Sequence, residues 1–259
     1  MKSSVAVLTA LALAASAASA SAAIINVGDS LSVSGTISGG QDTGWVSGNA
    51  GASYEDVYAG TFNLAVQDLT QQGSASFTLL TFCTDVGANW TTPNYYKATT
   101  FASVDGVAPP WNNPLPAIQN AAWLYNQEFV GQANLNADET AGVQLAIWKV
   151  LSDTAPGGQV SSGFSSGTLR AEYFSSAAMT DAENDISALN AARTGGSFTV
   201  YNQTWLQPTD SVGNPILTTQ GLLAPAAVPE PTATLAAACL LALPLGASMV
   251  RILRKNRLG

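Results

Sequence analysis

The chain has 259 residues, of which 47% are hydrophobic and only 10% charged, and its formal net charge is −8 at pH 7. This acidic balance repels nucleic acid phosphates, so we expect no nucleic-acid partner. The sequence contains no histidine and only two cysteines, which excludes His-based triads and His-ligated metal sites. The sequence also has no nucleophile elbow, paired-carboxylate motif or metal-ligand set, so we expect no metal, no cofactor and no enzymatic activity.

Residues 1–22 have the features of a cleavable export signal. Lys2 precedes an apolar run over residues 5–15, and small residues then lead to Ala20, Ser21 and Ala22. This order matches the A-x-A cleavage rule of secretory signal peptides. We predict a signal peptide over residues 1–22 and an exported protein that begins near Ala23.

The first half of the predicted body, residues 23–207, reads as β-structure. Apolar and polar residues alternate from about residue 24 to residue 84, and Gly39-Gly40 and Gly51 mark expected turns. The predicted strand 76–86 places Cys83 near its end, on one face with Phe77, Leu79 and Thr81.

The second half of the body changes to a helical period. We predict helices over residues 118–129, 139–152 and 181–192, the second capped by Asp138, and a closing strand over 197–205. The fold class is therefore α+β, a β-sandwich or barrel-like body with an inserted helical segment. Residues 208–227 are expected to be a linker.

One glutamine lies on the apolar side of the helix predicted over 139–152. Gln144 shares a stripe with Ile147, Trp148 and Leu151 at spacings of three and four residues. A buried amide without hydrogen-bond partners costs about 1–3 kcal/mol. Gln144 is therefore expected either to bond to backbone groups or to take part in a covalent bond.

Two short motifs carry a resemblance to a known family. Residues 81–85, Thr-Phe-Cys-Thr-Asp, and residues 143–148, Val-Gln-Leu-Ala-Ile-Trp, resemble the thioester domains of bacterial surface adhesins. In that family the cysteine and glutamine are joined, which implies a bond between Cys83 and Gln144. Asp85 and Trp148 fall in the same motifs as supporting residues, and Val143 stands where the family often has threonine.

The chemistry of this pair needs no histidine. A thiolate that attacks the Gln144 carbonyl expels ammonia, and an external amine can later open the thioester, with Asp85 as one candidate for moving the proton. The structural alternative makes Cys83 a small core residue, Gln144 a glutamine bonded to backbone and Asp85 a turn residue. Trp148 is a core residue in either case.

The C-terminal residues 228–259 form a tail of three parts. Val228, Pro229, Glu230 and Pro231 come first, an uncharged run over 232–250 follows, and a basic cluster ends the chain: Arg251, Arg254, Lys255 and Arg257. The run is long enough to be a transmembrane helix, and the basic cluster places its end in the cytoplasm. An ordinary single-span anchor has the same hydropathy.

This three-part order resembles the PEP-CTERM sorting signal of Gram-negative bacteria, which exosortases process. The resemblance implies an intermediate anchored in the inner membrane, cleavage near the Pro-Glu-Pro element, and delivery to the cell surface or extracellular matrix. Exosortase-type machinery and the membrane are then expected partners of the tail.

Two functions follow for the delivered body. The first is covalent adhesion to an amine-bearing protein or polysaccharide matrix through the Cys83–Gln144 thioester. The second is a non-covalent structural or carbohydrate-binding matrix protein, for which aromatic side chains such as Trp90, Tyr95, Tyr96 and Trp111 are candidates for stacking on sugars.

Overall fold

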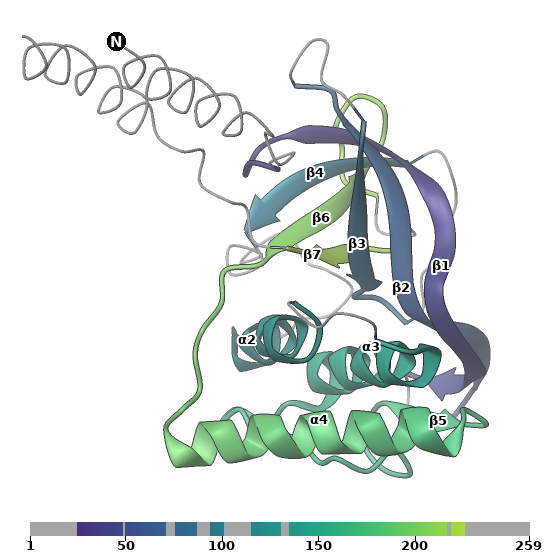
Figure 1. The fold of residues 1–259 in the computed structure, drawn as a ribbon, viewed down its shortest axis with the longest axis vertical. Helices are drawn as coiled ribbons and strands as arrows, with labels where there is room; N and C mark the ends of the chain where they lie inside the picture. The colour runs from purple at the N-terminus through teal and green to yellow at the C-terminus, as the bar shows by residue number, and fades with distance from the viewer. Residues whose placement is uncertain are drawn as a thin grey trace, which may run out of the picture. The chain divides into compact units, whose positions relative to one another are not determined.

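Six strands close into an antiparallel barrel, drawn in the upper part of Figure 1. The closed order is β1-β2-β3-β7-β6-β4 and back to β1, and every neighbouring pair is antiparallel. The strands are β1 (Ser30–Ser47), β2 (Glu55–Asp68), β3 (Phe77–Cys83), β4 (Asn94–Thr100), β5 (Arg170–Glu172), β6 (Thr204–Thr209) and β7 (Leu222–Ala224). Together with the helices this confirms a mixed α+β, barrel-like body.

The computed structural model describes residues 25–48, 50–70, 76–86, 94–100, 115–130, 135–216 and 219–225. The predicted signal peptide, the sorting motif at residues 228–231, the apolar run and the basic cluster lie outside these residues. Within the described ranges, no helix is both long enough and apolar enough to cross a membrane.

The barrel interior is lined by the residues that alternate along its strands. Cross-strand partners share a face, so the pairs Leu31–Tyr96, Leu64–Leu79 and Cys83–Leu222 all point inward. These six side chains are all buried. Cys83 lies at the end of β3 and shares a face with Leu79, as predicted, and the structure shows that this face is the interior of the barrel.

Two predicted connections are part of the barrel. Gly39 and Gly40 lie within β1, where the register with β2 shifts on either side of Gly39, so they accommodate a β-bulge and not a turn. The predicted linker 208–227 contains β7, which bridges β3 and β6. A three-residue strand has too few residues for its alternation to stand out in the sequence.

The helices lie on one side of the barrel. They are α2 (Leu115–Leu124), its continuation as the π-helix η2 (Tyr125–Phe129), α3 (Ala137–Asp153) and α4 (Ser176–Gly195). Figure 1 shows α2 and α3 below the barrel and α4 as the outermost layer. The middle helix α3 is consequently enclosed between β-structure and α4, and every residue from Thr140 to Leu151 is buried.

The structure corrects three predictions about where helices and strands begin. Asn136 caps α3 and forms a capping box with Glu139, whereas Asp138 accepts a hydrogen bond from the Ser175 hydroxyl. Ser175 itself caps α4, which begins five residues before the predicted start. The closing strand begins at Thr204, because most residues between 197 and 202 are exposed and form no regular structure.

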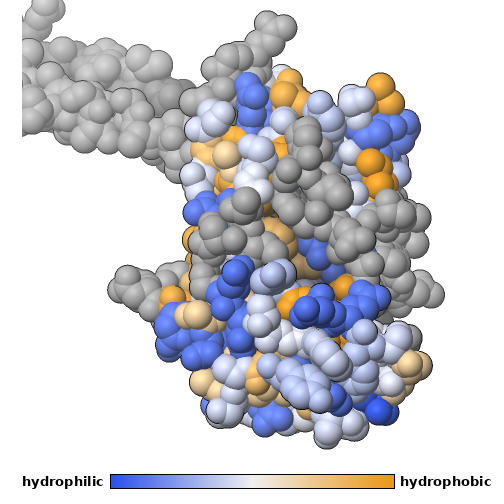
Figure 2. Space-filling model, turned by 90° about the vertical axis from the view of Figure 1, so that its right-hand side faces the viewer, coloured by the Kyte–Doolittle hydropathy of each residue, from blue (hydrophilic) through white to orange (hydrophobic). Residues whose placement is uncertain are grey.

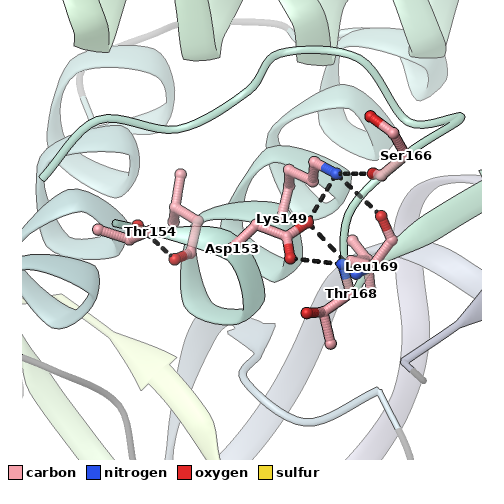
Figure 3. Close-up of polar contacts among 7 residues, drawn as sticks. Lys149, Asp153, Thr154, Ser166, Thr168 and Leu169 are labelled. Atoms are coloured by element: carbon pink, nitrogen blue, oxygen red, sulfur yellow. Dashed lines mark hydrogen bonds and ion pairs between the residues drawn. The ribbon is translucent and has the colours of Figure 1, made fainter. Parts of the chain in front are cut away.

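A buried ion pair fixes α3 to the loop that precedes β5 (Figure 3). The Lys149 ammonium, whose side chain is fully buried, lies 2.6 Å from the Asp153 carboxylate and donates to the carbonyls of Ser166 and Leu169. Asp153 also accepts from the backbone N–H of Thr168. Lys149 follows Gln144 by five residues, about 140° around the helix, so α3 is held from a side different from the one that carries Gln144.

Candidate functional site

The structure brings Cys83 and Gln144 together, although they are 61 residues apart in sequence. The backbone N–H of Cys83 donates to Oε1 of Gln144 at 2.8 Å, and Nε2 of Gln144 donates to the Cys83 carbonyl at 2.9 Å. The side-chain amide thus pairs with the end of β3 as a neighbouring strand would. The pairing between β2 and β3 ends at Thr81, and two residues later the Gln144 amide bonds to the backbone of Cys83.

Both residues are withdrawn from solvent, Gln144 completely and Cys83 to 1% exposure. Of the two possibilities expected for Gln144, the structure shows hydrogen bonds to backbone groups. The prediction of a single apolar stripe on this helix is wrong, because residues on every side of α3 are buried. Gln144 is positioned by a central helix, which fixes its amide against β3.

The Cys83 thiol is held by the next turn of backbone. Its Sγ donates to the carbonyl of Asp85 at 2.8 Å and accepts from the Asp85 N–H at 3.3 Å. Burial raises the pKa of the thiol well above its usual range, the bond to the Asp85 backbone opposes this, and the nearby Asp85 carboxylate adds to it. Cys83 is therefore a neutral thiol, and it is not part of a disulfide.

Trp148 lies one helical turn after Gln144 and is 2% exposed, which confirms it as a core residue. Its indole N–H has no hydrogen-bond partner that meets ordinary distance and angle limits. The indole N–H nevertheless favours the thiolate form of Cys83 and so lowers the pKa of the thiol. The Thr81 hydroxyl, on the same strand face as Cys83, is also buried without a partner. No sequence pattern indicates these unpaired donors.

A separate acidic pocket of about 260 Å³ lies between η2, α3 and α4. It is lined by Glu128, Glu139, Asp181 and Asp185, together with two apolar residues. Burial, followed by the charges of Glu128 and Asp181, raises the pKa of Asp185 to about 7. In the described part of the chain, no cluster of three or more potential ligands is arranged to hold a metal ion.

The aromatic residues considered for sugar binding do not form one surface. Tyr96 is fully buried in the barrel, where its hydroxyl donates to the Gln220 carbonyl, and Tyr95 is only partly exposed. Trp90 and Trp111 lie outside the described residues. A different aromatic group is exposed: Trp45, Tyr58 and Tyr173.

Comparisons with known proteins give no relative for this chain. No family model matches it, and neither a curated protein nor a solved structure does.

Proposed function

We propose that this chain is an exported, non-enzymatic surface or matrix protein whose body attaches covalently to amines through a Cys83–Gln144 thioester. The observation that carries the proposal is the pairing of the Gln144 amide with both backbone groups of Cys83, at 2.8 and 2.9 Å. Two residues distant in sequence thus lie side by side, which the thioester-domain resemblance requires, although Gln144 contacts the backbone of Cys83 and not its sulfur. The attachment is made once and is not turned over, so the protein is not a catalyst.

The pairing prepares the amide for attack. The Cys83 N–H donates to the Gln144 carbonyl oxygen, which is where negative charge develops when sulfur adds to the carbonyl carbon. The Gln144 nitrogen, the leaving group, is held by the Cys83 carbonyl. The Cys83 thiol donates a hydrogen bond to the Asp85 carbonyl, so the side chain must rotate away from that carbonyl before Sγ can reach Cδ of Gln144.

The reaction balances without a cofactor. The Cys83 sulfur forms a bond to Cδ of Gln144, the bond from Cδ to Nε2 breaks, and the thiol proton leaves with nitrogen as ammonia. A primary amine then attacks Cδ, the carbon–sulfur bond breaks, and an amide at Gln144 and a free thiol at Cys83 result. Asp85, two residues from Cys83, is the proposed carrier of the proton in both steps.

A purely structural glutamine would make the same two hydrogen bonds. The mass of the protein distinguishes the two roles, because only thioester formation releases ammonia. Intact mass spectrometry of the purified protein should give a value about 17 Da below that calculated for its observed termini, because ammonia is lost. Cys83→Ala and Gln144→Ala should each give the calculated mass. A wild-type mass without this deficit, together with a Cys83 thiol that is alkylated after unfolding, contradicts the thioester.

The proposed route to the surface rests on the tail. Val228, Pro229, Glu230 and Pro231, the uncharged run and the basic cluster support processing by an exosortase after insertion in the inner membrane. Replacing Pro229, Glu230 and Pro231 with alanine should leave the chain in the membrane fraction at its uncleaved mass. Release of this variant to the same extent as the wild type contradicts the sorting role.

The exposed aromatic group supports a second candidate, non-covalent binding of matrix polysaccharide. The Trp45 and Tyr173 rings meet edge to face with centroids 4.9 Å apart, and the register places Asp56 and Glu172 beside Trp45 on the same sheet face. The hydrophobic residues visible on the coloured surface of Figure 2 are scattered among hydrophilic ones, without a broad apolar area. Binding to the native matrix that Trp45→Ala abolishes and Cys83→Ala preserves would favour this candidate over covalent attachment.

A further inference from the structure

The unpaired indole of Trp148 calls for an explanation that packing does not provide. Trp148 is 2% exposed and its indole N–H is buried, yet this N–H donates no hydrogen bond. A buried donor without an acceptor lowers stability, and phenylalanine would fill much of the same space without that loss. A donor kept at this cost is of use if an acceptor appears during function.

Trp148 stands where such an acceptor would form. It follows Gln144 by four residues, so both side chains leave α3 on the same side, and Gln144 is bonded to Cys83. The Asp85 N–H, 3.3 Å from Sγ, already favours a negative charge on the sulfur, whereas the Asp85 carboxylate opposes that charge. The indole N–H would therefore be a second donor to the sulfur.

We propose that the Trp148 indole N–H is a donor reserved for the Cys83 sulfur, which it hydrogen-bonds when the thioester opens and negative charge develops there. The inference rests on the thioester of the proposed function and makes Trp148 the residue that sets its reactivity. In the closed thioester the sulfur carries no charge and is a weak acceptor. When an amine attacks Cδ of Gln144, the electron pair of the carbon–sulfur bond passes to Sγ, and the amine's proton finally neutralises the thiolate.

The test is the rate at which methylamine opens the thioester, followed by the gain of about 31 Da in intact mass. Trp148→Phe removes the N–H and keeps an aromatic ring. Loss of one hydrogen bond to a charged atom should slow the opening by about 10- to 100-fold. Trp123→Phe is the matched control, since Trp123 is a buried tryptophan on α2 that stacks on Phe198 and should leave the rate unchanged.

A second variant keeps the test decisive if Trp148→Phe does not fold. Site-specific replacement of Trp148 by 3-benzothienylalanine retains the shape of the two rings and exchanges the N–H for sulfur, so it should slow the opening to a similar extent. A merely structural role predicts the reverse, because a loosened core admits methylamine faster. An opening rate within twofold of the wild type, or above it, overturns the inference, whereas a wild-type chain without the mass deficit instead overturns the proposed function on which it rests.

Discussion

A thioester between Cys83 and Gln144 should stabilise the fold by a measurable amount. The bond would close a loop of 61 residues, and a cross-link of that span removes unfolded-state entropy worth about 4 kcal/mol. Cys83→Ala keeps the backbone groups that bond to Gln144 and removes the cross-link. We expect it to lower the free energy of unfolding by about 3–5 kcal/mol, of which about 1 kcal/mol is the lost packing of a small buried side chain.

The assay is equilibrium unfolding in urea, with the mass of each sample checked beforehand. Wild-type protein opened by methylamine has lost the same cross-link without a substitution, so its stability should also fall, by about 4 kcal/mol. If Cys83→Ala costs only about 1 kcal/mol and methylamine has no effect on stability, no cross-link is present and the reasoning is refuted.

Two further predictions concern the helices around the site. Lys149→Met leaves the Asp153 carboxylate without its cation and should lower the free energy of unfolding in urea by about 3–5 kcal/mol. The control Lys97→Met, at an exposed position, should change it by less than about 0.5 kcal/mol. Equal effects of the two substitutions would refute the anchoring role of the ion pair. The folded state holds the Asp185 proton up to about pH 7, whereas an unfolded Asp releases it near pH ~3.9, so stability should fall as pH rises between these values, by up to about 4 kcal/mol. Asp185→Asn should remove most of this fall between pH 5 and pH 8 and Glu183→Gln, on an exposed part of α4, should retain it; a slope unchanged by Asp185→Asn contradicts the assignment.

The helices could be predicted because each contains several turns of periodic sequence. The spacing around Gln144 predicts a helix over residues 139–152, and α3 extends only one or two residues further at each end. The sequence predicts Asp138 as the capping residue because Asp, like Asn, is favoured at that position. Asn136 takes it because Glu139 stands three residues later and completes the capping box.

Barrel closure could not be predicted in the same way, since it depends on contacts between distant segments. β1 is 18 residues long and pairs with three other strands, and its glycines permit the bulge at which the pairing shifts. β7 has only three residues and carries no alternation of its own, yet it supplies the contact between β3 and β6. Local patterns do not contain this information.

The candidate site was predicted from a resemblance between motifs, and the contact that the structure shows differs in kind from the one expected. Gln144 meets the backbone of Cys83, while the thiol turns to the Asp85 carbonyl. Sequence spacing places residues on faces of strands and helices, but it does not determine which rotamer a side chain adopts. For the same reason the unpaired N–H of Trp148 could not be foreseen.

The most direct test of the account is to locate the methylamine adduct. After treatment and proteolysis, the peptide that contains Gln144 should carry an N-methyl amide, about 14 Da heavier than glutamine, and Cys83 should become available for alkylation only in the treated protein. Unmodified glutamine at position 144, with Cys83 alkylated equally in treated and untreated protein after unfolding, would contradict the proposed covalent attachment.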